Sequence, residues 1–267
     1  MRTLAQPSPI SGTWIAWSRG AVLPVGLLLV WQAWAMTLPA DTRAPSPFRV
    51  ATTFGHLVAT GDLPSAITQS LGRVLAGFAV SLVLGIVLGV LMGRFRLFRQ
   101  SIEPVIDSFR PVAPMAILPI AILWLGTGTP AALSIVAYAA FFPLLLNTMH
   151  GVVGVDTKLV QAARSMGVRP LRILTKVVVP AAMPSILLGA RLGMGVAWTA
   201  IIAAELAVGS KSGGGSSGGI GSMMFIFYAY SIDLNGIVVC MIVVGLVALF
   251  IDLLFRAAEA RLLPWRQ

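Results

Sequence analysis

The chain has 267 residues, of which 57% are hydrophobic and only 10% charged, and its formal net charge is +10. Soluble domains average about 45–50% apolar and about 25% charged residues, and disordered chains are poor in apolar residues, so both classes are excluded. A nucleic-acid-binding protein is also disfavoured, because so few charges are available to build a basic surface. The single cysteine, Cys240, excludes an intrachain disulfide and a cysteine metal cluster, and its apolar neighbours favour a packing role.

Six apolar segments are long enough to cross a bilayer, which takes about 20 residues. They cover residues 21–38, 74–92, 105–125, 130–149, 181–204 and 234–251. We therefore expect an all-α, polytopic membrane protein with about six transmembrane helices.

The first segment, 21–38, has a second interpretation as a secretory signal peptide. Ala33-Trp34-Ala35 has the small-x-small pattern of a cleavage site. The stretch before it is long and holds only Arg2 and Arg19 as charges, which favours a retained helix. Cleavage would leave the other five spans in the same orientation.

The positive charges concentrate on one side of this arrangement, between the second and third spans, between the fourth and fifth, and after the sixth. They are Arg94, Arg96, Arg99, Lys158, Arg164, Arg169, Arg172, Lys176, Arg256, Arg261 and Arg266. The positive-inside rule places these segments and both termini in the cytoplasm. Topology thus explains most of the net charge.

Small residues recur at every fourth position in two spans. The second span has Gly77, Ser81, Gly85, Gly89 and Gly93, and the fifth has Ser185, Gly189, Gly193 and Ala197. This spacing places small side chains on one helix face, where backbones can approach closely. We favour packing within one subunit, with a subunit interface as the alternative.

The third span is rich in prolines, each of which removes an intrahelical hydrogen bond: Pro104, Pro111, Pro114 and Pro119. Freed carbonyls are tolerated at membrane depth where they are buried in protein or face a watery cavity. This span therefore either lines a path or is kinked for packing. Pro180 and Pro184, in contrast, suit the entrance of the fifth span.

Charges inside the spans are candidates for function. Asp107 and Arg110 are three residues apart, so they can pair on one helix face. Arg191 has no acid at that spacing and needs a partner from another helix, water or an anionic solute. Glu205 is roughly 21 Å further along the same helix at 1.5 Å per residue, and it should lie near the outer end.

The loop after the fourth span predicts a helical hairpin. Asp156 suits an N-cap, Gly167 can end the first helix in a left-handed conformation, and Pro170 can open a second helix. An apolar stripe at helical spacing consists of Leu159, Val160, Ala163 and Met166. A hairpin that is apolar on one side and basic on the other could dock into a cleft of a soluble partner.

This loop resembles the EAA loop of ABC-type importer permeases, E-A-A-x3-G-x9-I-x-L-P. The matching residues, with every spacing intact, are Gln161-Ala162-Ala163, Gly167, Val177, Val179 and Pro180. Gln161 stands where the family has Glu, so a charge that could pair with an Arg or Lys of the partner is replaced by an amide that still forms hydrogen bonds.

Further short motifs, over about residues 44–255, resemble the nitrate, sulfonate, taurine and bicarbonate branch of these permeases. They are Ala44-Pro45-Ser46-Pro47, residues 70–78, Leu118-Pro119 with 124–128, Ala204-Glu205-Leu206 and Gly219-Ile220-Gly221. One departure is the glycine-rich run 211–220, which is typical of a flexible linker, either a natural outer loop or an introduced one.

The resemblance implies the type I ABC importer permease fold, as one domain over residues 1–267. Its core would be residues 66–255, with a coupling loop at 156–180 and an N-terminal helix at 21–38. The chain would sit in the bacterial cytoplasmic membrane and import a small anionic solute, such as a sulfonate, taurine, nitrate or bicarbonate, by alternating access. Its partners would be a cytoplasmic ABC ATPase dimer, a second and identical permease, membrane lipid, and a periplasmic or lipid-anchored solute-binding protein, with no nucleic acid.

The sequence has no G-x4-G-K-[ST] motif, so we expect ATP and Mg²⁺ to bind the partner ATPase and this chain to hold no cofactor and no catalytic residue. His56 and His150 are isolated, which argues against a metal site. The expected ATPase-coupling residues are Gln161, Ala162, Ala163, Gly167 and Arg169. The expected translocation-pathway residues are Met115, Pro119, Arg191 and Trp198. The alternatives are an ATP-independent secondary transporter and, less favoured, a membrane-embedded scaffold or enzyme.

Overall fold

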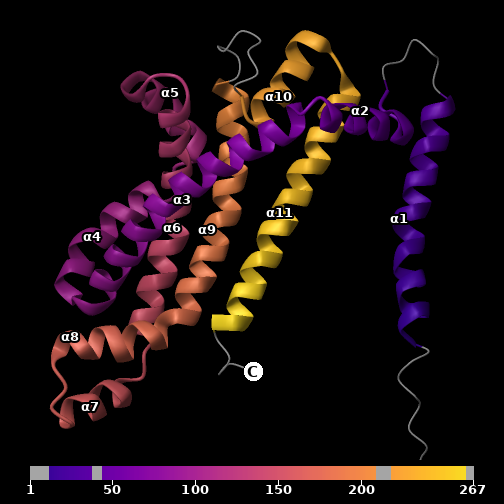
Figure 1. Ribbon diagram of the computed structural model, residues 1–267. Coiled ribbons are helices and arrows are strands. Elements are labelled where there is room, and N and C mark those ends of the chain that lie inside the picture. Colours follow the sequence, from indigo (N-terminus) through magenta and orange to yellow (C-terminus); the bar gives the residue numbers. More distant parts are fainter. Residues whose placement is uncertain (1–11, 38–43, 209–217, 263–267) are drawn as a thin grey trace, which may run out of the picture.

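The computed structural model describes residues 12–37, 44–208 and 218–262, which fold into helices and short connections without a strand in these ranges (Figure 1). Four helical stretches are long and apolar enough to span a bilayer: α3 (Asp62–Arg94), α6 (Thr129–Val153), the continuous stretch Pro170–Val208 and α11 (Leu234–Leu262). A fifth candidate is the bent pair α4 (Arg96–Phe109) and α5 (Pro114–Leu125). The all-α, polytopic prediction is confirmed, while the described residues give four or five spanning elements where six were expected.

The other elements are the segments of the stretch Pro170–Val208, the shorter helices, and α1 at the side of the bundle (Figure 1). They are α1 (Gly12–Thr37), α2 (Pro47–Ala59), α7 (Thr157–Ser165), α8 (Pro170–Ile173), η1 (Leu174–Val178), α9 (Val179–Val208), α10 (Ile220–Ile226) and η3 (Phe227–Ser231). Figure 1 shows α1, which covers most of the first predicted span, standing apart from the other long helices. It contacts α2 and the segment just before it, where the Pro45 carbonyl accepts a hydrogen bond from Trp31 Nε1 over 3.1 Å.

Helix α6 packs along both α3 and α9 and forms the centre of the core. The small-residue stripes make this packing possible. A Cβ added to Gly89 of α3 would lie 2.7 Å from the Thr148 Cβ of α6, and one added to Gly189 of α9 would lie 2.7 Å from the Asn147 Cβ. Only a glycine leaves room for such an approach, so the prediction of packing within one subunit is confirmed.

The third predicted span, 105–125, is not one helix, and this expectation is wrong. It is divided between α4 and α5, which meet at an angle of 94°. Proline lacks an N–H and disfavours the α conformation of the residue before it, and Ala113, before Pro114, is extended with φ −63° and ψ 136°. The break frees carbonyls, and the Tyr138 hydroxyl of α6 lies 2.6 Å from the carbonyl oxygen of Phe109.

The fifth span begins earlier than predicted, at Pro170, and continues for 39 residues to Val208. Pro180 and Pro184 lie inside this helix, so their assignment to a helix entrance is wrong. The helix tolerates Pro180 through the wider π turn η1, in which the Val179 N–H donates to the Leu174 carbonyl, five residues back. The second arm of the hairpin, α8, and the spanning helix are therefore one continuous element.

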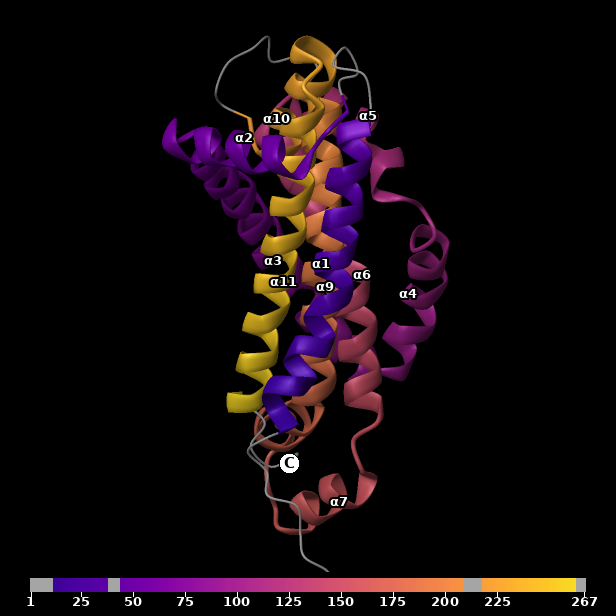
Figure 2. The same ribbon diagram turned by 90° about the vertical axis from the view of Figure 1, so that its right-hand side faces the viewer.

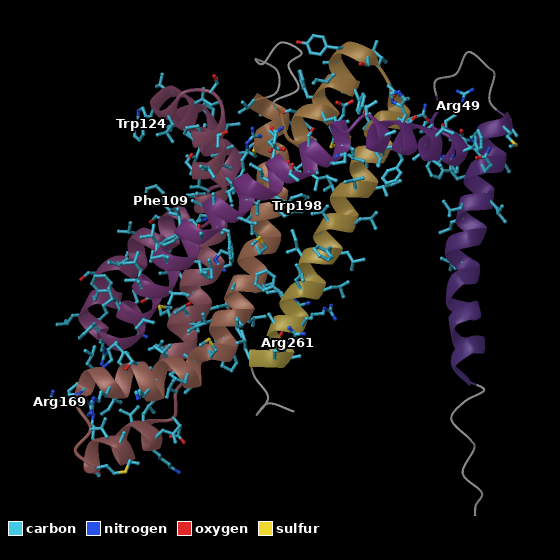
Figure 3. The ribbon with its side chains drawn as sticks, in the orientation of Figure 1. Arg49, Phe109, Trp124, Arg169, Trp198 and Arg261 are labelled. Atoms are coloured by element: carbon cyan, nitrogen blue, oxygen red, sulfur yellow. The ribbon has the colours of Figure 1, made fainter. Side chains whose placement is uncertain are left out.

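The basic segments gather at one end of the molecule, the lower end in Figure 1, which we call the basic end. The α3–α4 corner, α7, α8 and the end of α11 all lie there, and Figure 2 shows the same grouping from the side. Arg169 and Arg261 mark the basic end in Figure 3, whereas Arg49 marks the opposite end. The fold thus brings together the charges that the sequence places in separate loops.

Candidate functional site

The hairpin at the basic end is built by local capping. The Asp156 side chain accepts a hydrogen bond from the Lys158 N–H over 2.8 Å and caps α7. Gly167 adopts φ +72°, the left-handed conformation that favours glycine, and lets the chain turn back. Arg169 is the extended N-cap of α8, and Pro170 opens that helix. The predicted N-cap, left-handed turn and second helix start are all confirmed.

One face of the hairpin packs against the bundle and the other does not. Ala163 is 4% exposed and belongs to an apolar cluster with Ile173 and Val178. Of the predicted apolar stripe, Ala163 is buried and Val160 partly buried, whereas Leu159 and Met166 are 52% and 74% exposed. Because large apolar side chains that remain exposed mark interaction sites, the outer face of the hairpin has the composition of a docking surface.

The expected coupling residues divide between these two faces. Gln161, Ala162, Gly167 and Arg169 are exposed, and Figure 3 places Arg169 at the outer edge of the hairpin. Ala163 is buried in the hairpin's own core, so its small size positions α7 against α8. Leu171, 72% exposed beside Arg169, belongs to the same outer face and was not among the expected residues. Its exposure could not be predicted because the sequence does not say which face of so short a helix is covered.

The expected pathway residues lie on two different elements. Met115 and Pro119 are exposed on α5. Trp198 is 2% exposed, and its indole N–H donates to the Val244 carbonyl of α11 over 3.1 Å (Figure 3). Arg191 also faces α11. The structure does not bring the four together, and their role in a pathway stays a prediction.

Arg191 has a partner from another helix, one of the three possibilities left open by the sequence. Its Nε lies 2.6 Å from Asp252 Oδ1 of α11, and Arg256 Nε lies 2.8 Å from Asp252 Oδ2. The Arg191 and Asp252 side chains are 29% and 34% exposed. Two guanidinium groups share one carboxylate, so this group of three side chains keeps one net positive charge.

A cavity of about 540 Å³ lies beside the break between α4 and α5. Its polar wall consists of Arg110, Tyr138, Asn147 and His150, and the rest is mostly apolar. Within the described residues Arg110 forms no ion pair, so the Asp107–Arg110 pair that the spacing allows is not formed. Arg110 is exposed, so its guanidinium lies at a cavity that opens at the surface of the helix bundle, where it is suited to contact an anionic solute.

At the opposite end, Glu205 ties α3, α9 and α10 together in a buried polar cluster that sequence reasoning missed. Its carboxylate lies 2.9 Å from Arg73 Nη1, accepts from the Ser70 hydroxyl over 2.7 Å, and accepts from the Gly221 N–H over 3.1 Å. A Cβ on Gly219 would overlap with this carboxylate. The sequence did hold a signal for this cluster: Arg73 and Glu205 carry opposite charges, and each lies at the end of a predicted span.

The fold and the hairpin define a class: a polytopic helical membrane protein with a helical hairpin at its basic end. Residues 81–264 match the family described as the inner membrane component of binding-protein-dependent transport systems. The chain belongs to this family of ABC importer permeases, as the sequence resemblance implied.

Named relatives and solved structures agree with this assignment. The chain is 33% identical to the putative aliphatic sulfonates transport permease of Bacillus subtilis, over 94% of this chain and 88% of the relative. It is 32% identical to the taurine transport system permease of Escherichia coli, over 83% and 74%. The inward-facing MetNI methionine ABC transporter shares the fold, with a TM-score of 0.62 at 17% identity over 75% of this chain and 96% of that chain. The type I importer permease fold is thereby confirmed.

Proposed function

We propose that this chain forms the translocation path of an ATP-driven importer for a small anionic solute of the sulfonate, taurine, nitrate or bicarbonate class. A separate ATPase would dock on the hairpin at the basic end, on the cytoplasmic side, and a solute-binding protein would deliver solute at the opposite end. Two copies of the chain would enclose one path. Relatives named for sulfonates and for taurine support the solute class.

The observation that carries the proposal is the continuity of the helix from Pro170 to Val208. It runs from the hairpin, through the bend between α8 and α9 that Figure 1 shows, to the Glu205 cluster. A displacement of the hairpin is therefore passed along an unbroken helix to the wall of the bundle, which is what alternating access requires. The cavity beside the α4–α5 break, with Arg110 on its wall, is the part of the bundle best suited to pass an anion.

The docking surface gives the first prediction. Replacing both Met166 and Leu171 with glutamate is expected to abolish copurification of the ATPase and to lower ATP-dependent uptake about tenfold or more. Both side chains are large, apolar and exposed, and the change would put two charges into the apolar contact with the ATPase. The measurements are pull-down of the ATPase from membranes and uptake of radiolabelled sulfonate by proteoliposomes of the complete transporter.

The matched control is Gln100→Glu, which adds an acid at an exposed position of α4 outside the hairpin. It should leave both readouts unchanged. Normal ATPase binding by the Met166→Glu/Leu171→Glu chain would refute the docking surface. Solute uptake without ATPase and ATP would instead favour the secondary-transporter alternative.

The Arg191–Asp252 pair gives the second prediction, which separates a structural from a solute-binding role. If Arg191 serves the anionic solute, Arg191→Gln raises the KM for uptake several-fold, whereas Asp252→Asn frees the guanidinium and does not raise it. If Arg191→Gln and Asp252→Asn lose folded protein equally, the ion pair only stabilises the fold and does not bind solute. The measurement is the KM for uptake together with thermal unfolding of each purified variant.

A further inference from the structure

A second cavity lies at the basic end, between the α3–α4 corner and the hairpin, and the transport proposal does not use it. Its volume is about 590 Å³. Arg94, Arg96 and Arg99 line it from the corner, and Arg164 lines it from α7. Gln161, the residue that stands where the family has glutamate, is on the same wall. The cavity therefore connects the first cytoplasmic corner with the expected coupling loop.

Three of the four arginines that line this cavity have no ion pair within the described residues. No carboxylate is among its lining side chains. Among the four arginines, Arg99 alone forms an ion pair in the described residues: its Nε lies 4.0 Å from Glu103 Oε2, which is too far for a hydrogen bond. The same Arg99 Nε is buried and has no hydrogen-bond partner. The positive charges of four arginines that line one cavity repel one another, and an anion bound among them would relieve that repulsion. Guanidinium groups bind phosphate oxygens in two-point contacts, so phosphate is the anion that this arrangement fits best.

The surroundings favour a phosphate that is carried by a lipid. Phe95 and Leu97, which flank Arg96 in the chain, are 54% and 81% exposed. Exposed apolar side chains beside arginines are typical of a segment that lies at the level of the lipid headgroups. The inner wall of the cavity is apolar, formed in part by Val152, Ile173 and Val178, and suits the glycerol and the first acyl carbons.

We propose that this cavity binds the headgroup of one anionic phospholipid of the cytoplasmic leaflet. The phosphate contacts Arg96 and Arg99 on the corner and Arg164 on α7, so the lipid joins the two segments. Because α7 is joined to the long helix through the Gly167 turn and α8, a bound lipid holds the coupling loop in a fixed position relative to α3. This last consequence rests on the proposed function, whereas binding of the lipid does not.

The test compares lipids on the wild-type chain in its complete transporter complex. Native mass spectrometry after delipidation and re-addition should show one phosphatidylglycerol held per permease chain and no equivalent retention of phosphatidylcholine. Arg96→Gln/Arg99→Gln should lower the retained phosphatidylglycerol about tenfold or more, because each arginine contributes to anionic-lipid affinity. Arg96→Lys/Arg99→Lys, which keeps the charge, should retain more lipid than the glutamine variant and shows whether loss of folding explains the result.

The matched control is Arg172→Gln/Lys176→Gln, which removes the same charge from basic residues that do not line the cavity. It should retain the lipid as the wild type does. Equal retention of the two lipids by the wild type, or equal losses in both glutamine variants, would overturn the proposal. The proposal would also be overturned if soluble glycerol phosphate bound as tightly as the lipid. The same holds if the Arg96→Gln/Arg99→Gln chain lost ATPase docking but retained the lipid. Lipid retention without any ATP-driven uptake would refute the transport proposal and leave this one standing.

Discussion

Replacing Arg73 with methionine is expected to destabilise the folded chain by about 3–5 kcal/mol, because the change leaves a buried carboxylate without its cation. The Glu205 side chain is only 1% exposed and that of Arg73 17%, with 2.9 Å between Arg73 Nη1 and Glu205 Oε1. Water cannot replace the guanidinium at such a buried carboxylate. The hydrogen bonds from Ser70 and Gly221 remain, but they do not supply a full positive charge.

A double-mutant cycle separates this effect from simple loss of side-chain volume. Arg73→Met/Glu205→Gln should be more stable than Arg73→Met alone, because a neutral amide still forms hydrogen bonds and carries no uncompensated charge. The measurement is the free energy of unfolding in detergent micelles, followed by circular dichroism. Arg49→Met removes an exposed arginine at the same end and should change stability by less than about 0.5 kcal/mol. If Arg73→Met behaves like Arg49→Met, the cluster does not stabilise the fold.

The features that the sequence predicts correctly are local ones. The hairpin depends on Asp156, Gly167 and Pro170, whose capping and turn preferences act within a few residues. The packing of α3 and α9 on α6 follows from a spacing that any helix converts into one small-residue face. In both cases the physical cause lies inside one segment, so the segment alone is enough to predict the structure.

The features that were missed depend on contacts between distant segments. Ser70 and Glu205 are 135 residues apart in the chain, and Arg191 and Asp252 are 61 apart. The sequence shows that each charge needs a partner, but the partner is set by the way the helices pack. The break between α4 and α5 is an intermediate case. Its prolines are visible in the sequence, but the size of the bend also depends on distant groups such as Tyr138, whose hydroxyl donates a hydrogen bond to the freed Phe109 carbonyl.

Gly89→Ala is expected to destabilise the chain by about 1–3 kcal/mol, because the new methyl group has no space between α3 and α6. A Cβ at this position lies 2.7 Å from the Thr148 Cβ and 2.8 Å from the Leu145 carbonyl oxygen. The second contact is with backbone, so a change of side-chain rotamer cannot relieve it and the two helices must separate. Gly89→Leu should cost more, since its branch extends further into α6. The measurement is again the free energy of unfolding in micelles, together with the yield of folded protein.

The same helix provides the control, because Gly72 of α3 has no atom within 4 Å of an added Cβ. Gly72→Ala should leave stability unchanged or raise it by up to about 1 kcal/mol, since alanine is the better helix former and loses less backbone entropy on folding. If Gly89→Ala lowers the free energy of unfolding and Gly72→Ala does not, the loss at Gly89 comes from the close approach of α3 and α6. Equal effects at both positions would mean that helix propensity decides the stability, and the small-residue stripe would then have no special role in holding α6 at the centre of the bundle.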